Sequence, residues 1–191
     1  RASVLSADFL AEFQHWVEAL RRNEKVPNWD YSLTLQNDES VIAMHYTLRL
    51  QMSYLFYESE QAVEILERLQ QTVKDVYPLP NTHLYYLYRS LWQIDFMNAG
   101  AVLQYHRQYK LDIKESLRKF KKSSKTAPHN FEHLYMLLLA ENCQMKKLDG
   151  EAMLYYDRAL QLARIHQFEQ DAALIYERAA KFYGKQLDHT K

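Results

Sequence analysis

The chain has 191 residues, and its 24 Lys and Arg balance its 24 Asp and Glu, so the formal net charge is zero. A neutral total gives no overall field to attract nucleic acid or an anionic membrane, and any polyanion site has to be local. Only 3 Gly and 4 Pro interrupt a sequence rich in helix formers, which predicts an all-α fold. No apolar run approaches the roughly 20 residues that span a bilayer.

A single cysteine, Cys143, excludes an internal disulfide and fits a reducing compartment, so we expect a cytoplasmic protein. The first residue is Arg1 instead of Met. We therefore expect a piece excised from a longer chain, with part of the function outside it.

Eight helices are expected along the chain. The first follows a cap at Ser6 and carries apolar residues at spacings of three and four. Residues 26–37 mix aromatic and turn residues and are expected to form an ordered loop, and proline marks breaks at Pro78, Pro80 and Pro128. The expected helices span 7–23, 40–57, 61–76, 82–98, 101–123, 130–147, 151–167 and 170–184, within a single domain over 1–191.

An internal repeat emerges when the chain is shifted by 50 residues. A turn proline and a turn glycine keep register, together with aromatic and aliphatic residues between them. Residues 130–167 and the segment before them are therefore predicted to be copies of one helical hairpin, with a more divergent third copy around 57–60. The matched positions are Pro78, His83, Leu84, Tyr85, Leu87, Gly100 and Tyr105 with Pro128, His133, Leu134, Tyr135, Leu137, Gly150 and Tyr155.

The hairpin at 130–167 is expected to turn at residues 148–150. Its second helix has a face of mostly small residues, Ala152, Tyr156, Ala159, Leu160 and Ala163. Small side chains let two helix backbones approach closely, but one hairpin cannot bury this face alone and needs stacked neighbours. The helix at 170–184 has a similar stripe with no following partner, so we expect it to be covered by another repeat or another molecule.

Residues 140–163 resemble a tetratricopeptide repeat. Ala140, Ala152, Tyr156 and the pair Ala159-Leu160 match its small and aromatic packing positions, although Arg164 replaces its closing proline. The resemblance implies helical hairpins stacked into a right-handed superhelix, an α-solenoid fragment.

A narrower resemblance covers the last third of the chain. The motifs are Asn130-Phe131-Glu132-His133, the run from Gly150 to Ala159, and Ala179-Ala180-Lys181-Phe182-Tyr183. They are similar to the repeat region of large signalling proteins in which a kinase-like domain and an AAA/STAND-type ATPase precede the repeats and GAF and histidine-kinase modules follow. The resemblance implies no catalytic residue and no cofactor, and the chain contains no phosphate-binding G-x-x-x-x-G-K-[ST] loop.

In tetratricopeptide arrays the first helix of each pair lines a concave groove. Register with Ala140 places one set of residues there, and the 50-residue shift and the first copy supply the rest. An apolar groove with few charges suits a protein or peptide partner, or a neighbouring domain that fills it. The candidate groove residues are Gln51, Tyr54, Leu87, Leu91, Ile94, Leu137, Glu141 and Gln144.

Two other patterns bear on chemistry. His129-Asn130-Phe131-Glu132-His133 fits the H-x-x-E-H arrangement of zinc hydrolases. Pro128 and Asn130 are expected to leave His129 at or before the helix cap, which favours a structural role and no metal site. Ser, His and acidic residues are otherwise scattered, without a motif that places a nucleophile beside a base.

A basic cluster lies around the C-terminal end of the helix expected at 101–123. Cations there offset the helix dipole and stay solvated, and a patch for a polyanion or acidic partner is the alternative. Its members are Lys114, Arg118, Lys119, Lys121, Lys122 and Lys125.

The sequence thus favours a non-enzymatic repeat domain that links or regulates modules of a larger signalling protein. The partners expected are proteins or peptides, including flanking domains, with self-association through the terminal helices as a further possibility and no binding to nucleic acid or membrane. The alternative is a free-standing regulator or secreted effector scaffold that binds a partner in the concave groove.

Overall fold

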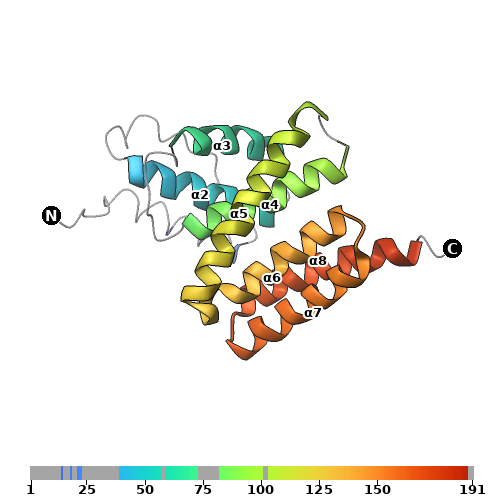
Figure 1. Ribbon diagram of the computed structural model, residues 1–191. Helices are drawn as coiled ribbons and strands as arrows, with labels where there is room; N and C mark the ends of the chain where they lie inside the picture. Colours follow the sequence, from blue (N-terminus) through green and yellow to red (C-terminus); the bar gives the residue numbers. More distant parts are fainter. Residues whose placement is uncertain are drawn as a thin grey trace. The chain divides into compact units, whose positions relative to one another are not determined.

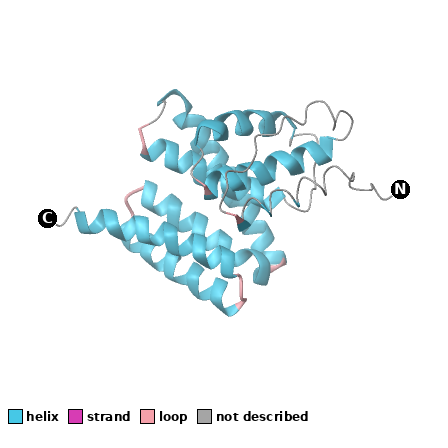
Figure 2. Ribbon diagram, turned by 180° about the vertical axis from the view of Figure 1, so that it is seen from behind, coloured by secondary structure: helices cyan, strands magenta, loops and turns pink. Residues whose placement is uncertain are grey.

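The computed structural model describes residues 14, 18, 21–22, 39–56, 59–72, 82–100 and 103–188. All regular elements within these ranges are helices, as the all-α prediction requires (Figure 2). None of the described helices is long and apolar enough to cross a membrane. The chain divides into two compact units, Arg1–Tyr85 and Tyr86–Lys191, and each is described by itself.

The helices follow the predicted order. Of the helix expected at 7–23, only Gln14, Glu18 and Arg21 are described, each as helical, and the loop at 26–37 lies outside the described residues. A short 3-10 turn, η2 (Leu103–Tyr105), precedes α5. The bounds are α2 (Glu39–Leu55), α3 (Ser59–Thr72), α4 (Thr82–Asn98), α5 (His106–Thr126), α6 (Pro128–Met145), α7 (Asp149–Ile165) and α8 (Glu169–Asp188).

In the first unit, α2 and α3 pack against each other. The side chains that α2 buries include Ala43, Leu50 and Tyr54, and α3 buries an apolar stripe at helical spacing, Ala62, Ile65, Leu66 and Leu69. The guanidinium of Arg68 lies 5.8 Å from the ring centroid of Tyr46, which joins the two helices at their edge.

In the second unit, consecutive helices pack on one another from α5 to α8, and α6 also contacts α8. Helices α6, α7 and α8 lie side by side in both views (Figures 1 and 2). Alanine at the contact positions lets the helices approach closely: Ala140, Ala152, Ala159, Ala163 and Ala179 are all buried. The small-residue face of α7 therefore packs as its spacing predicts.

Two equivalent turns join α6 to α7 and α7 to α8. A residue with positive φ follows the C-cap of each helix, Lys147 at 58° after α6 and Gln167 at 61° after α7. The next amide then bonds back to a carbonyl five residues earlier, Leu148 N to Cys143 O at 3.0 Å and Phe168 N to Ala163 O at 2.9 Å. This is the Schellman arrangement, which satisfies carbonyls at a helix end. The two turns are 20 residues apart and have the same hydrogen-bonding pattern.

The break predicted at Pro128 agrees with the structure, since α5 ends at Thr126 and Pro128 is the first residue of α6, where its missing N–H costs nothing. Two other details of the predicted layout are wrong. The turn lies at residues 146–148 instead of 148–150, because Lys147 takes the left-handed conformation and Gly150 is already helical. Helix α8 also continues past Gly184 to Asp188.

Candidate functional site

The candidate groove residues are mostly buried. Gln51 and Gln144 are half-buried, whereas Tyr54, Leu87, Leu91, Ile94, Leu137 and Glu141 are buried. The first two in sequence, Gln51 and Tyr54, belong to the first unit and the other six to the second. Six of these side chains are therefore buried and offer little surface to a partner, and the groove itself stays a prediction.

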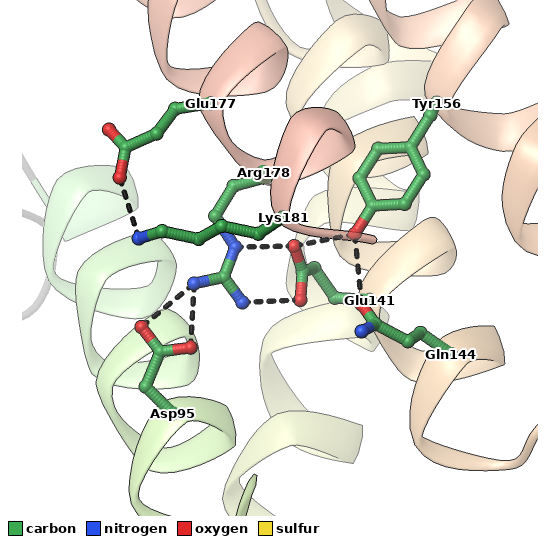
Figure 3. A network of polar contacts seen from close by, with 7 residues as sticks. All are labelled: Asp95, Glu141, Gln144, Tyr156, Glu177, Arg178 and Lys181. Atoms are coloured by element: carbon green, nitrogen blue, oxygen red, sulfur yellow. Dashed lines mark hydrogen bonds and ion pairs between the residues drawn. The ribbon is translucent and has the colours of Figure 1, made fainter. Parts of the chain in front are cut away.

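Glu141 lies at the centre of a polar network in the second unit (Figure 3). Its carboxylate is fully buried, with 0% exposure, and its partner Arg178 on α8 is 4% exposed. Arg178 donates from Nε to Glu141 Oε1 and from Nη2 to Oε2, both at 2.6 Å. A two-pronged, charge-assisted pair of this kind holds two helices in one relative register.

The network reaches two further helices. Tyr156 of α7 donates its hydroxyl to Glu141 Oε1 at 2.8 Å, and to Gln144 Oε1 at 3.2 Å. Arg178 Nη1 also donates to both carboxylate oxygens of Asp95 on α4, at 2.6 and 2.8 Å. Four helices are thus tied at one buried point, where an uncompensated charge would be costly.

Two other polar clusters bridge helices of the same unit. Arg89 of α4 donates to the backbone carbonyl of Asp112 and to the side chains of Glu115 and Ser116 on α5. His133 of α6 pairs through Nε2 with Asp171 Oδ2 of α8 at 2.8 Å. The imidazole ring of His133 stacks on the ring of Phe168, with the two ring centroids 4.7 Å apart. These contacts join α4 to α5 and α6 to α8.

The H-x-x-E-H segment starts α6 and does not follow the expected geometry. His129 lies inside the first turn, so the expectation that it sits at or before the cap is wrong. It nevertheless faces His166, with the two Nδ1 atoms 3.3 Å apart, while His133 faces Asp171. Among the residues that the structure describes, no group of three or more His, Cys, Asp or Glu side chains is arranged to hold a metal ion.

The thiol of Cys143 is buried on α6, with its sulfur 3.8 Å from Glu151 Oε2. Burial, and then the negative charge of Glu151, raise the pKa of the Cys143 thiol above its ordinary value. A higher pKa leaves less thiolate at neutral pH, and the thiolate is the nucleophile. Cys143 thus packs inside the second unit beside Glu151.

An open pocket of about 410 Å³ lies where the end of α7 meets the first half of α8. Small side chains form its floor and Tyr176, 47% exposed, stands at its edge with the Arg164 guanidinium 5.9 Å from its ring. The stripe predicted on the last helix is thus divided, since Ala172, Ile175 and Ala179 are buried while Tyr176 and Ala180 are exposed. The pocket is lined by Ala163, Arg164, Gln167, Glu169, Ala172, Ala173 and Tyr176.

Sequence reasoning missed Arg178 and the pocket. The signal for Arg178 was present, because it is a charged residue between Ile175 and Ala179 in an apolar stripe. Its partner Glu141 lies 37 residues earlier, on a helix that only the stack brings close.

The second unit thus combines packed helices, a buried polar network and an open pocket on α7 and α8. No protein-family model, curated protein or solved structure matches the chain.

Proposed function

We propose that this chain is a non-catalytic helical-repeat domain that holds and regulates neighbouring modules of a larger signalling protein. The observation that carries the proposal is the pair of equivalent turns 20 residues apart, at Lys147 and Gln167, which make α6, α7 and α8 a regular stack. Stacks of this kind bury a continuous core between units and present extended surfaces to partners. The tetratricopeptide-like superhelix and its signalling context remain part of the proposal.

The pocket on α7 and α8 is where a neighbour would bind. Its lining includes the exposed ring of Tyr176 together with Ala172 and Ala173. A protein segment that inserts an apolar side chain into the pocket would cover Tyr176, and aromatic residues of this kind often anchor interfaces.

The buried network supplies a means of coupling. Arg178 lies on the same helix as Tyr176 and joins α8 to Glu141 and Asp95. A partner that shifts α8 has to move this ion pair as a unit, because separating buried charges is costly. Binding at the pocket would therefore be transmitted to α4 and α6 through Arg178.

Hydrogen exchange tests the proposal. Amides of α8 should exchange more slowly in a protein that includes the coding sequence on both sides than in the 191-residue chain. Tyr176→Glu, placed at the edge of the pocket, should abolish that protection, whereas Leu154→Glu, on an exposed position of α7, should leave it intact. Equal exchange in the long and short proteins, or neighbouring sequence without an ATPase, GAF or kinase module, would refute the proposal.

A further inference from the structure

A row of cations runs along the exposed face of α5. It follows helical spacings of three and four and lies opposite the face that buries Asp112, Ile113, Ser116 and Phe120. Its ends are 18 residues apart, which corresponds to about 27 Å of helix. We call it the α5 cationic stripe: Arg107, Lys110, Lys114, Arg118, Lys121, Lys122 and Lys125, all exposed.

No acidic side chain of the described residues forms an ion pair with the stripe. The two acids of α5 are engaged elsewhere, since Asp112 accepts hydrogen bonds from Gln93 and Gln108, and Glu115 pairs with Arg89. Like charges three or four residues apart repel each other and destabilise a helix. The stripe therefore weakens the isolated helix, and an anionic partner would relieve that repulsion.

The helix dipole does not account for the stripe. Its effect is confined to the first and last turns, and the basic residue in the last turn of α5 is Lys125. At the other end, Arg107 lies in the first turn, which carries no acidic residue and where the dipole disfavours cations. Solvated cations at a helix C-terminus thus explain the last turn of the stripe and leave the preceding part, about four turns, unexplained.

Apolar side chains accompany the cations. Leu111, 53% exposed, lies between Arg107 and Lys114 on the same face, and Leu103, 78% exposed, precedes the stripe in η2. A duplex groove would gain little from these leucines, and Gln108, the one side-chain amide on α5, is already bonded to Asp112. A lipid surface accommodates both kinds of side chain, with cations at the phosphates and leucine at the acyl boundary.

We propose that the α5 cationic stripe binds the second unit to an anionic phospholipid surface. Clusters of four to eight Lys and Arg on a helix bind acidic lipids with about 1 kcal/mol for each cation near the surface. The neutral total charge, which led us to expect no membrane binding, conceals this local field because the balancing acids lie on other elements. The proposal concerns a different surface from the α7–α8 pocket and does not depend on the proposed function.

Vesicle co-sedimentation of the 191-residue chain tests the proposal. The protein should sediment with vesicles of phosphatidylcholine and phosphatidylserine in equal parts and not with phosphatidylcholine alone, and added salt should weaken binding. Combining Lys114→Gln, Arg118→Gln and Lys121→Gln should lower the partition coefficient on the order of 100-fold. Leu111→Ala should cause a smaller loss that does not depend on salt.

The matched control combines Lys146→Gln, Lys147→Gln and Lys185→Gln, which removes the same charge from exposed positions outside α5. It should bind like the parent chain, and unchanged helicity and melting of both triple variants would show that they fold. Equal losses in both triple variants would overturn the proposal, as would absence of binding to phosphatidylserine vesicles. Tighter binding to a DNA duplex than to vesicles, lost only in the stripe variant, would reassign the stripe to nucleic acid.

Discussion

Helices α7 and α8 start after equivalent turns, so Tyr156 and Tyr176 occupy corresponding positions 20 residues apart. Tyr156 is fully buried and donates its hydroxyl to Glu141, whereas Tyr176 is exposed at the edge of the pocket. The residue that corresponds to Glu141 on α7 is Gln161, which is exposed and accepts a hydrogen bond from Arg158. The buried tyrosine, Tyr156, thus has a carboxylate partner on the preceding helix, whereas the exposed Tyr176 has a glutamine at the corresponding place. We call the position of Tyr156 closed and that of Tyr176 open.

The comparison shows how a repeated pattern acquires separate roles. Equivalent turns and buried alanines bring the helices together at both the α6–α7 and the α7–α8 interface. The buried charges of Glu141 and Arg178 lie at the closed position. A tyrosine in the closed position contributes to stability, and one in the open position remains available to a partner.

The largest expected effect comes from charge in the closed interface. Ala152→Glu places a carboxylate at a position with no exposure and should destabilise the second unit by about 4 kcal/mol or more, because the charge is buried without a partner. Ala173→Glu, on the exposed face of α8, should change stability by no more than about 0.5 kcal/mol. Urea unfolding followed by circular dichroism measures both, and an unchanged midpoint for Ala152→Glu would contradict the tight packing of α7.

Removing the cation of the network should come next. Arg178→Met leaves Glu141 buried with a hydroxyl partner only, and should cost about 3 kcal/mol. Adding Glu141→Leu removes the stranded charge and should recover most of that loss, since apolar replacements of buried pairs are often neutral. A double variant no more stable than Arg178→Met alone would show that the loss does not come from leaving Glu141 buried without its cation.

The two tyrosines provide the most direct test of the comparison. Tyr156→Phe deletes a hydrogen bond to a buried carboxylate and should cost about 1.5 kcal/mol. Tyr176→Phe should lie within about 0.5 kcal/mol of the parent chain. Equal values from parallel urea titrations would mean that the two positions do not differ as described.

Much of the helical layout follows from periodicity and from proline and glycine. The helix expected at 82–98 has both of its ends where the structure places them, and Ala152 and Ala159 pack as their spacing predicts. The turns were placed too late because a lysine and a glutamine adopt a conformation usually left to glycine. Propensity alone does not reveal such a residue.

The candidate site was harder to predict. Register placed Glu141 on a groove, but its partner Arg178 comes from a helix two elements later. An ion pair between distant segments depends on how the helices stack, which the pattern of a single helix does not encode. The pocket beside Tyr176 has the same origin, since it arises where the stack leaves a face uncovered.

The smallest effects test the turns themselves. Lys147→Gly should stabilise the chain by about 0.5–1 kcal/mol, because glycine avoids the left-handed penalty that a side chain meets at φ 58°. Gln167→Gly should behave alike. Gly150→Ala is the control: this glycine is helical and an added Cβ meets open space, so alanine should stabilise by at most about 1 kcal/mol. If the turn instead lay at Gly150, Gly150→Ala would lower the melting temperature and the two glycine variants would not raise it. Thermal melts of the three variants distinguish these outcomes.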